Sequence, residues 1–516
     1  MLENTGRITL NNNMLPYLIR TFRGGISDET DKGIEGSYKH GYGLDIHGRD
    51  DVLTGKQAMA TVFDVSTGVL SGSHTGTTQA GIIQFFVPAT DGSLYCFGST
   101  GSIFTRSGDG QWTFSYNDEN GAIKGAAEWK LSDGTNWLYW ATATSLARKQ
   151  LQGADITPDS GTGRWTDATQ DYKTTLNAAD WHTMKNASGE LIIANAESAS
   201  TVDFAGNFVA NDLNIRPGNL IKCLEERDDY AILGSGRLDN SEEGHLWSWI
   251  TTVQTWIQKK RIPVKGINSM ISTELLLLQG GDNGEIFFSD FVNSVPLHAI
   301  PGGGQSMPDG VSIEDDLAIW GIYGGTYPGL WSYGRRRKNR PHALNYDYRL
   351  ARTVAGSSIS TIAAVAMVNG ELLASWGTTD GSISEYGVDA VSSTTKAVGI
   401  YEGLEFSGGA PHLKKEFETV KLTLSPMVSG TSVSVKYRKD NATTGGDSSA
   451  NEGFRYAVTG SGATSFGEAD TVEAIFSIGD MANVYEVGVE LNPTSNLSPE
   501  IHSVVTYIGD GTQDYA

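Results

Sequence analysis

Residues 91–107, DGSLYCFGSTGSIFTRS, decide the fold, because their pattern returns along most of the chain. The stretch contains a polar turn, a short apolar run, a Gly/Ser-rich connection and a second run that alternates. The Asp-Gly pair supplies the positive φ angles of a tight hairpin, and each run has the length of a strand. Six further segments follow the same order, and they begin at Asp133, Ser188, Asp228, Thr273, Asp315 and Asn369.

The spacing of these seven segments predicts a β-propeller. Their starts lie roughly 40 to 55 residues apart, which is room for three or four short strands in each blade. Continuous apolar runs such as LLLL (275–278) are typical of inner strands that face neighbouring sheets on both sides. We expect about seven blades over residues 45–402. The number is fixed to within one, since ring closure can borrow a strand from either end.

Both ends of the chain differ from the repeat. After Gly403 the segments ETVKLTLSP, TSVSVKYRKD, TVEAIFSIG, NVYEVGVELN and IHSVVTYIG alternate, which predicts an antiparallel β-sandwich over residues 403–516. A Gly/Ser-rich excursion at about 440–470 is typical of a long loop or an extended hairpin. Residues 1–44 are weakly periodic, and we interpret them as an N-terminal arm that lies on a neighbour or on the ring. The predicted fold class is therefore all-β.

Composition restricts the partners. The net charge of −22 disfavours contact with phosphate backbones, so we expect no sequence-specific nucleic-acid binding, although an acidic lumen suits a passage along which DNA slides. Cys96 and Cys223 are the two cysteines, too few for a disulfide framework. No stretch reaches about 18 apolar residues, and the first residues lack the apolar core of a signal peptide, so we expect no membrane span.

Residues 106–114, RSGDGQWTF, resemble the Asp-box turn of sialidases, with Gln111 where that pattern has glycine. We interpret them as a hairpin turn with an aromatic plug, since Asp-boxes lie away from the catalytic centre. The tripeptide RIP at 261–263 also resembles a sialidase element, but it lies in the middle of the chain rather than before the first blade.

The other candidate motifs are better interpreted as turn-forming residues than as catalytic or metal-binding sites. The acidic pairs at 228–229 and 315–316 open strands, and DNGE at 282–285 fits a hairpin better than a calcium loop. The chain has no HExxH, no phosphate-binding loop and no GxSxG. We therefore predict a protein that is not an enzyme and needs no cofactor or metal.

One basic run differs from the acidic background: GRRRKNRPH at 334–342, shortly after an aromatic strand. Such a run could dock an acidic neighbour, bind an anionic glycan, or simply be a solvated loop. We favour an interface. Its candidate residues are Arg335, Arg336, Arg337, Lys338, Arg340 and Trp331.

The two ends of the chain carry a resemblance. PYLIRTFRGGISDETDKGIEGSYKHGYGLDIHGRDDVLTG (16–55) leads into the propeller, and VYEVGVELNPTSNLSPEIHSVVTYIG (484–509) closes the sandwich. Together they resemble virion structural proteins of tailed bacteriophages. The resemblance covers most of the chain but depends on short anchors.

The resemblance implies a structural component of a virion tail: a nozzle or ring, a tail-surface part, or a baseplate subunit. Such proteins assemble in the host cytoplasm with copies of themselves and with other virion proteins, and no catalytic residue carries over from them. The alternative is a host-surface propeller that binds or cleaves glycans, with Trp320, Tyr323, Tyr327 and Trp331 as its aromatic platform. A general protein-interaction propeller of cellular origin is a third reading.

Overall fold

The computed structural model describes residues 15–27, 36–49, 51–65, 81–151, 165, 168–239, 241–354, 359–380, 383–407, 411–444 and 453–509. In this part of the chain nearly all regular structure is β, with one four-residue helix, α1 (Ala351–Val354). The chain divides into two compact units. The propeller unit comprises Met59–Trp331 and Leu350–Val391, and the two-sheet unit comprises Met1–Ala58, Ser332–Arg349 and Ser392–Ala516.

Seven four-stranded sheets follow one another along the described chain, one for each predicted repeat. The first three contain β6 (Ile83–Pro88), β7 (Leu94–Gly98), β8 (Ser102–Arg106) and β9 (Trp112–Asn117); β10 (Gly125–Lys130), β11 (Asn136–Ala141), β12 (Leu146–Leu151) and β13 (Thr169–Lys173); and β14 (Met184–Ala187), β15 (Glu190–Asn195), β16 (Ser198–Val202) and β17 (Phe208–Asn214). The next two contain β18 (Asn219–Arg227), β19 (Tyr230–Arg237), β20 (Gly244–Trp249) and β21 (Gln258–Ile262); and β22 (Ile267–Ser272), β23 (Leu276–Gly280), β24 (Glu285–Ser289) and β25 (Ser294–Ala299). The sixth contains β26 (Val311–Glu314), β27 (Leu317–Ile322), β28 (Gly329–Gly334) and β29 (Ala343–Tyr348). The seventh contains β30 (Thr361–Val368), β31 (Glu371–Asp380), β32 (Ile383–Lys396) and β5 (Gln57–Asp64).

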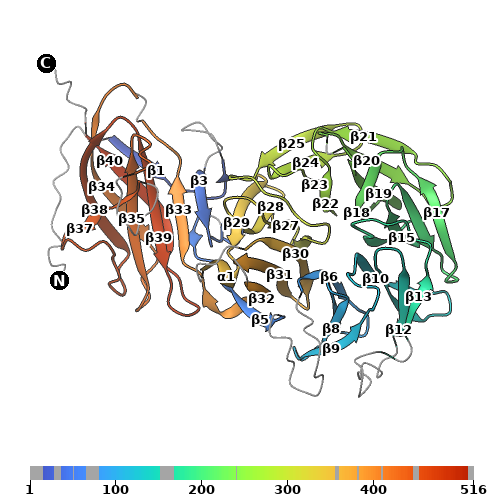
Figure 1. Cartoon of the computed structure of the whole chain (residues 1–516). Helices are drawn as coiled ribbons and strands as arrows, with labels where there is room; N and C mark the ends of the chain where they lie inside the picture. The colour runs from blue at the N-terminus through green and yellow to red at the C-terminus, as the bar shows by residue number, and fades with distance from the viewer. Residues whose placement is uncertain are drawn as a thin grey trace. The chain divides into compact units, whose positions relative to one another are not determined.

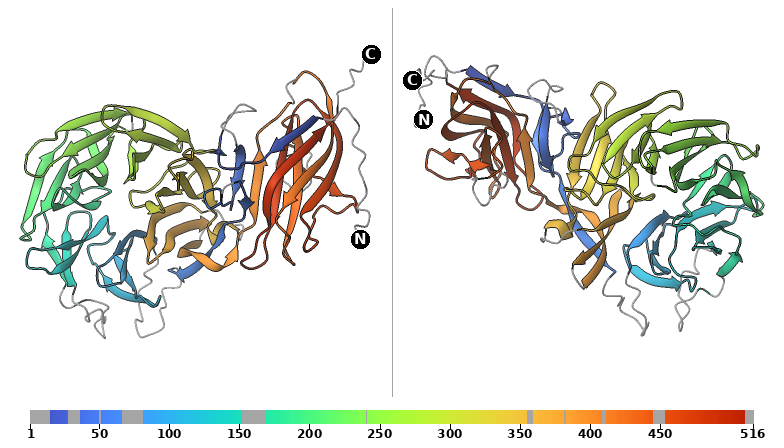
Figure 2. Two further views of the ribbon diagram at one scale, coloured as in Figure 1. Left: turned by 180° about the vertical axis from the view of Figure 1, so that it is seen from behind. Right: turned by 45° about the horizontal axis from the view of Figure 1, so that its top comes forward.

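The first strands of these sheets form a closed ring (Figures 1 and 2). Each first strand contacts that of the next sheet, from β6 through β10, β14, β18, β22 and β26 to β30, and β30 contacts β6 again. The all-β propeller predicted from the repeat is therefore present. The seventh sheet takes its outer strand, β5, from the N-terminal side, as a ring that closes by borrowing a strand requires.

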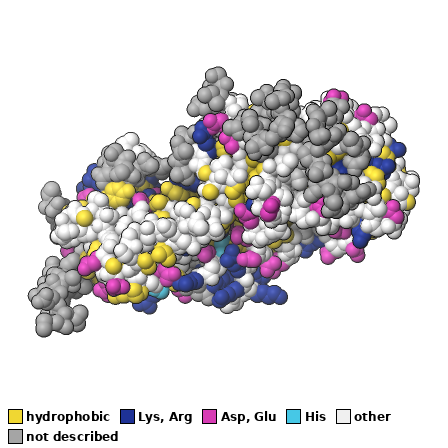
Figure 3. Space-filling model, turned by 90° about the horizontal axis from the view of Figure 1, so that it is seen from below, with side chains coloured by type: hydrophobic (Ala, Val, Ile, Leu, Met, Phe, Trp, Pro, Cys, Tyr) yellow, Lys and Arg dark blue, Asp and Glu magenta, His cyan; other side chains and the backbone are white. Residues whose placement is uncertain are grey.

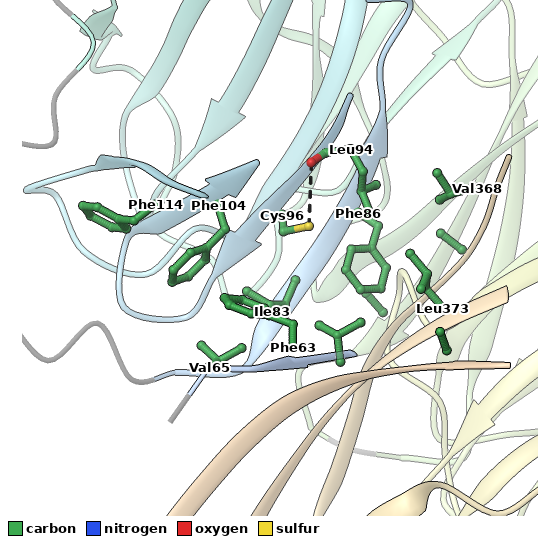
Figure 4. Close-up of a cluster of buried hydrophobic side chains, with 14 residues drawn as sticks. Phe63, Val65, Ile83, Phe86, Leu94, Cys96, Phe104, Phe114, Val368 and Leu373 are labelled. Atoms are coloured by element: carbon green, nitrogen blue, oxygen red, sulfur yellow. Dashed lines mark hydrogen bonds between the residues drawn. The ribbon is translucent and has the colours of Figure 1, made fainter. Parts of the chain in front are cut away.

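Phe63 of β5 is buried at this closure. It belongs to a hydrophobic cluster with side chains of the first and seventh sheets, and Figure 4 shows it next to Ile83. Its ring stacks on Trp112, with 4.4 Å between the ring centroids, and meets the edge of Phe104. Beside it, the Asp389 carboxylate accepts hydrogen bonds of 2.8 Å from Thr61 Oγ1 of β5 and from Trp376 Nε1. Burial of Phe63 and the bond from Thr61 to Asp389 hold β5 in the ring.

The turns between first and second strands have the predicted chemistry. Asp228, Asp229, Asp315 and Asp316 all have positive φ, so these acids form turns as expected. Residues 106–114 form the β8–β9 hairpin, in which Asp109 accepts from the backbone N–H of Gln111. The prediction of a hairpin with an aromatic plug is confirmed, because Phe114 is buried against Phe104.

The two-sheet unit has two six-stranded sheets. One contains β1 (Leu15–Ile19), β40 (Glu500–Ile508), β34 (Lys415–Leu424), β38 (Glu473–Ala482) and β37 (Val458–Thr459), with β4 (Leu53–Thr54) also paired to β40. The other contains β2 (Gly25–Ile26), β3 (Ser37–Tyr42), β33 (Gly399–Gly403), β39 (Tyr485–Asn492), β35 (Ser432–Lys439) and β36 (Arg455–Tyr456). Phe417 of β34 meets Tyr485 of β39, so buried aromatic rings join the sheets. This is the layered arrangement of a β-sandwich.

The structure divides the chain differently from the predicted ranges 1–44, 45–402 and 403–516. Within residues 1–44, β1 pairs with β40 and β3 pairs with β33, so the described part of the expected arm consists of sheet strands. β29, inside the predicted propeller range, belongs to the two-sheet unit, since β2 and β3 pack on it there. In the 440–470 excursion, β36 and β37 each pair with a long strand; residues 445–452 lie outside the described residues.

A buried ion pair crosses one of these sheets. Lys436 of β35 reaches over β39 to Glu402 of β33, with 2.6 Å between Nζ and Oε1, and both side chains are buried. Gly488 lies between them in the register. A Cβ at Gly488 would lie 2.9 Å from Lys436 Cγ and 2.9 Å from the Tyr401 carbonyl oxygen. The missing side chain of Gly488 therefore leaves the space in which Lys436 lies.

The closure of the ring can be tested at Phe63. We expect Phe63→Ala to lower the free energy of unfolding by about 3 kcal/mol, because it leaves a cavity between the first and seventh sheets. Val62→Ala, on the same strand but 38% exposed, should cost less than about 1 kcal/mol. Denaturant titration followed by tryptophan fluorescence measures both. Equal losses in the two variants would contradict the role of Phe63.

The crossing lysine can be tested at Gly488. We expect Gly488→Ala to destabilise the protein by about 3 kcal/mol, because the methyl group displaces Lys436 and leaves Glu402 buried without its partner. Gly460→Ala is the control, since a Cβ there meets no atom within 4 Å. Thermal unfolding by calorimetry compares the two, and a Gly488→Ala variant as stable as the control would refute this account.

Candidate interaction site

The predicted basic run forms a short, braced turn between β28 and β29. Arg340 N donates to the Arg337 carbonyl oxygen at 3.0 Å, and Arg335 Nη1 donates to the Lys338 carbonyl oxygen at 3.0 Å. Arg337 and Lys338 are exposed at its tip, whereas Arg335 and Arg336 are half-buried. One backbone bond and one side-chain bond thus brace this turn, and Arg337 and Lys338 lie at its exposed tip.

Arg340 is the structural member of the run. It is buried, and its Nη1 lies 3.5 Å from the His47 carbonyl oxygen as a donor. Burial lowers the pKa of Arg340, and the Arg23 charge lowers it further, while Asp45 opposes this. Arg340 therefore anchors the turn and cannot reach a partner, which corrects its assignment to the interface.

Trp331 is also wrongly assigned to the interface. Its side chain is fully buried, and its indole Nε1 donates to the Tyr327 carbonyl oxygen at 3.2 Å. All six residues of β28 are buried, so an aromatic side chain at either face of this strand enters a core. An interface role for Arg335, Arg336, Arg337 and Lys338 stays a prediction.

The aromatic platform of the glycan alternative is not formed. Trp320 is fully buried, like Trp331. Tyr323 is half-buried, its hydroxyl donates to Met307 Sδ at 3.4 Å, and burial raises its pKa to about 12. Tyr327 is half-buried. Because both tryptophans are enclosed in the core, the four rings do not form a shared open surface.

Cations gather locally although the whole chain is acidic. On the face drawn in Figure 3, Lys and Arg side chains are concentrated in one area among scattered Asp and Glu side chains.

Among the described residues, no group of three or more His, Cys, Asp and Glu side chains could hold a metal ion. No helix in that part of the chain is long and apolar enough to cross a membrane.

Sequence reasoning missed a pocket of about 380 Å³ in the propeller unit. Its walls come mainly from the first strands of three sheets, β6, β10 and β14, with additions from β11 and from the loop before β26. Its lining residues are Phe86, Val87, Pro88, Thr90, Ala126, Ala127, Glu128, Lys130, Asn136, Met184, Lys185, Asn186 and Asp309. The pocket is polar at several points and is linked across sheets, since Asn136 Nδ2 donates to Thr90 Oγ1 at 2.7 Å.

Asp309 is the unusual group of this pocket. Its Oδ2 accepts the Phe86 backbone N–H at 2.9 Å, which joins the loop before β26 to β6. Burial raises the pKa of Asp309 to about 7, although the Phe86 N–H and the Lys185 charge act in the opposite direction. Lys185 itself pairs with Glu225 at 3.0 Å. Near neutral pH the pocket therefore contains a carboxyl group that is partly protonated.

Comparison with known proteins gives similarity of structure only. No protein-family model matches the chain, and no curated protein matches it. Solved structures that match include the RRP9 WD40 repeats (13% identity, 66% of this chain and 99% of that chain, TM-score 0.45) and U3-55K (13%, 65% and 98%, TM-score 0.44). The WD40 β-propeller domain of Doa1 also matches (12%, 65% and 98%, TM-score 0.39). At these values the matches say nothing about the partners or activity of this chain.

Asp309 gives a pH dependence with a defined sign. Because its pKa is higher in the folded protein than the ordinary 3.8, its contribution to stability is greatest at low pH and is lost as pH rises through about 7. We therefore expect the free energy of unfolding of Asp309→Asn, minus that of the native protein, to be larger at pH 8 than at pH 5. Denaturation midpoints of both proteins at the two pH values measure this. A difference that does not change with pH would contradict a raised pKa.

Proposed function

We propose that this chain is a non-enzymatic structural component of a tailed-phage virion that assembles through protein–protein contacts. The observation that supports this most is the pairing of the two segments that carry the resemblance. β1 and β4, from the 16–55 segment, both pair with β40, from the 484–509 segment. The two segments that carry the resemblance lie far apart in the sequence but form one folded module. This is expected if the chain inherited both segments together, and not if each matched by chance.

The basic turn supplies a contact surface suited to such a component. Its tip presents Arg337 and Lys338 on a chain of net charge −22, so acidic surfaces of neighbouring copies or of other virion proteins are complementary to it. A turn whose backbone is already fixed loses little conformational entropy on binding. We propose that this tip contacts an acidic neighbour in the assembled particle.

The origin of the chain can be tested on particles. Tailed particles purified by density gradient from the source culture should contain this chain at a fixed ratio to the major capsid protein, as measured by quantitative mass spectrometry. Its absence from intact particles would refute a virion role.

The basic turn can be tested separately by charge reversal. We expect the variant with Arg337→Glu and Lys338→Glu to associate at least about tenfold more weakly with itself or with purified particle proteins, because like charges then face each other. The variant with Arg20→Glu and Lys414→Glu is the control, since it makes the same charge change at exposed positions of the same unit. Light scattering and co-sedimentation measure association. Equal weakening in both variants would show a general charge effect and contradict a contact at the tip.

A further inference from the structure

The outer strand of the fourth sheet, β21, presents a second group of cations. Three consecutive residues, Lys259, Lys260 and Arg261, lie on this strand. The register places Lys259 opposite Trp247 and Arg261 opposite His245, so the two cations share one side of the sheet. Lys260 points to the other side, where its Nζ donates to the Val292 carbonyl oxygen at 2.5 Å.

Two further cations act on the side of Lys259 and Arg261. Burial lowers the pKa of Lys259, and the charges of Arg216 and Arg237 lower it further, whereas Glu243 acts in the opposite direction. Two carboxylates oppose them. Glu243 lies 3.2 Å from Arg261, and Asp239 lies 3.2 Å from Arg237. Among these described residues the cations outnumber the carboxylates, so the local charge is positive.

His245 responds to this positive charge. Its pKa is lowered to about 4, first by burial, then by Lys259, and further by Arg261 and Arg216, whereas Glu243 acts in the opposite direction. Burial is the main cause of this shift, and the nearby cations add to it, so an added anion would favour the charged imidazole.

Apolar side chains lie next to these cations. Trp256 is 39% exposed, and its ring meets the edge of Trp247 at 5.3 Å between centroids. Lys259 Nζ lies 4.7 Å from the centroid of the same Trp247 ring. Ile257 and Val253 are 45% and 42% exposed. An exposed tryptophan on a strand edge that also carries cations has the composition of strongly binding parts of protein interfaces.

We propose that this rim patch, defined by Trp256, Lys259, Arg261, Arg216 and Arg237, docks an acidic segment of another polypeptide that also carries apolar side chains. Carboxylates of the segment meet the cations, and its apolar side chains cover Trp256 and Ile257. A protein partner fits better than a nucleic acid, because the exposed aliphatic side chains of Val253 and Ile257 offer a surface that apolar side chains cover and a phosphate backbone does not. The inference does not depend on the virion proposal, because it involves a different unit and a different surface from the basic turn.

The probe for this proposal is a fluorescein-labelled peptide of glutamates with two central leucines, and a peptide with glutamine at each glutamate is its control. We expect the glutamate peptide alone to bind in a fluorescence anisotropy titration, more weakly as salt rises. Arg261→Glu and Trp256→Ala should each weaken binding at least about tenfold. Lys265→Glu is the matched control, since Lys265 is an exposed cation of the same unit that pairs with Asp282 instead.

A second readout separates binding at the patch from binding elsewhere. Saturation with the glutamate peptide should raise the pKa of His245 in an NMR titration, because anions then lie near the imidazole. Circular dichroism checks that each variant folds, and Arg261→Gln replaces Arg261→Glu if the latter does not. Equal weakening by Arg261→Glu and Lys265→Glu, or an unchanged His245 pKa, would overturn the proposal. Tighter binding of a heparin oligosaccharide or of single-stranded DNA, lost in the same variants, would overturn a polypeptide partner.

Discussion

The propeller depends on the closure of its ring, where β30 contacts β6 and Phe63 packs between the first and seventh sheets. A ring of sheets has no independent end, so each sheet is stable only when both of its neighbours are in place. The other pairs of successive sheets join segments that follow one another in the chain. The closure instead joins β5, which precedes all other blade strands, to β32, which follows them. Burial of one aromatic ring and the bonds to Asp389 therefore complete a structure built from hundreds of residues.

The sequence predicted those features that depend on local chemistry. Each repeat contains its own turn signal, and acids such as Asp315 and Asp316 adopt the positive φ that their position indicated. The N-terminal strands could not be found in this way, because the partners of β1 and β3 lie hundreds of residues away, in β40 and β33. The charge of the basic turn could be read from the sequence, but not which of its residues are buried and which are exposed. Burial of Arg340 and Trp331 depends on neighbours that a local pattern does not reveal. The pocket around Asp309 was missed for the same reason, since three different repeats supply its walls.

An acidic chain uses its few cations in two ways. Buried cations hold the fold together: Lys436 crosses a sheet to Glu402, and Lys56 reaches Asp347 at 2.7 Å. Cations at the surface gather at separate places, the tip of the basic turn and the edge of β21. Isolated surface ion pairs add little to stability, so clustering at exposed positions is better explained by recognition than by folding. On a background of negative charge, such clusters favour contact with acidic surfaces and disfavour contact with basic ones.

The pairing of β1 with β40 has a mechanical consequence. In this antiparallel pair the first residue of one strand, Leu15, lies opposite the last residue of the other, Ile508. Tension applied through these two positions would open the pair like a zipper, one rung at a time, and at low force. The pair would also yield before any load reached the blades, because both loaded strands belong to the two-sheet unit. A pull applied at Leu15 and Ile508 would thus first separate β1 from β40 within the two-sheet unit.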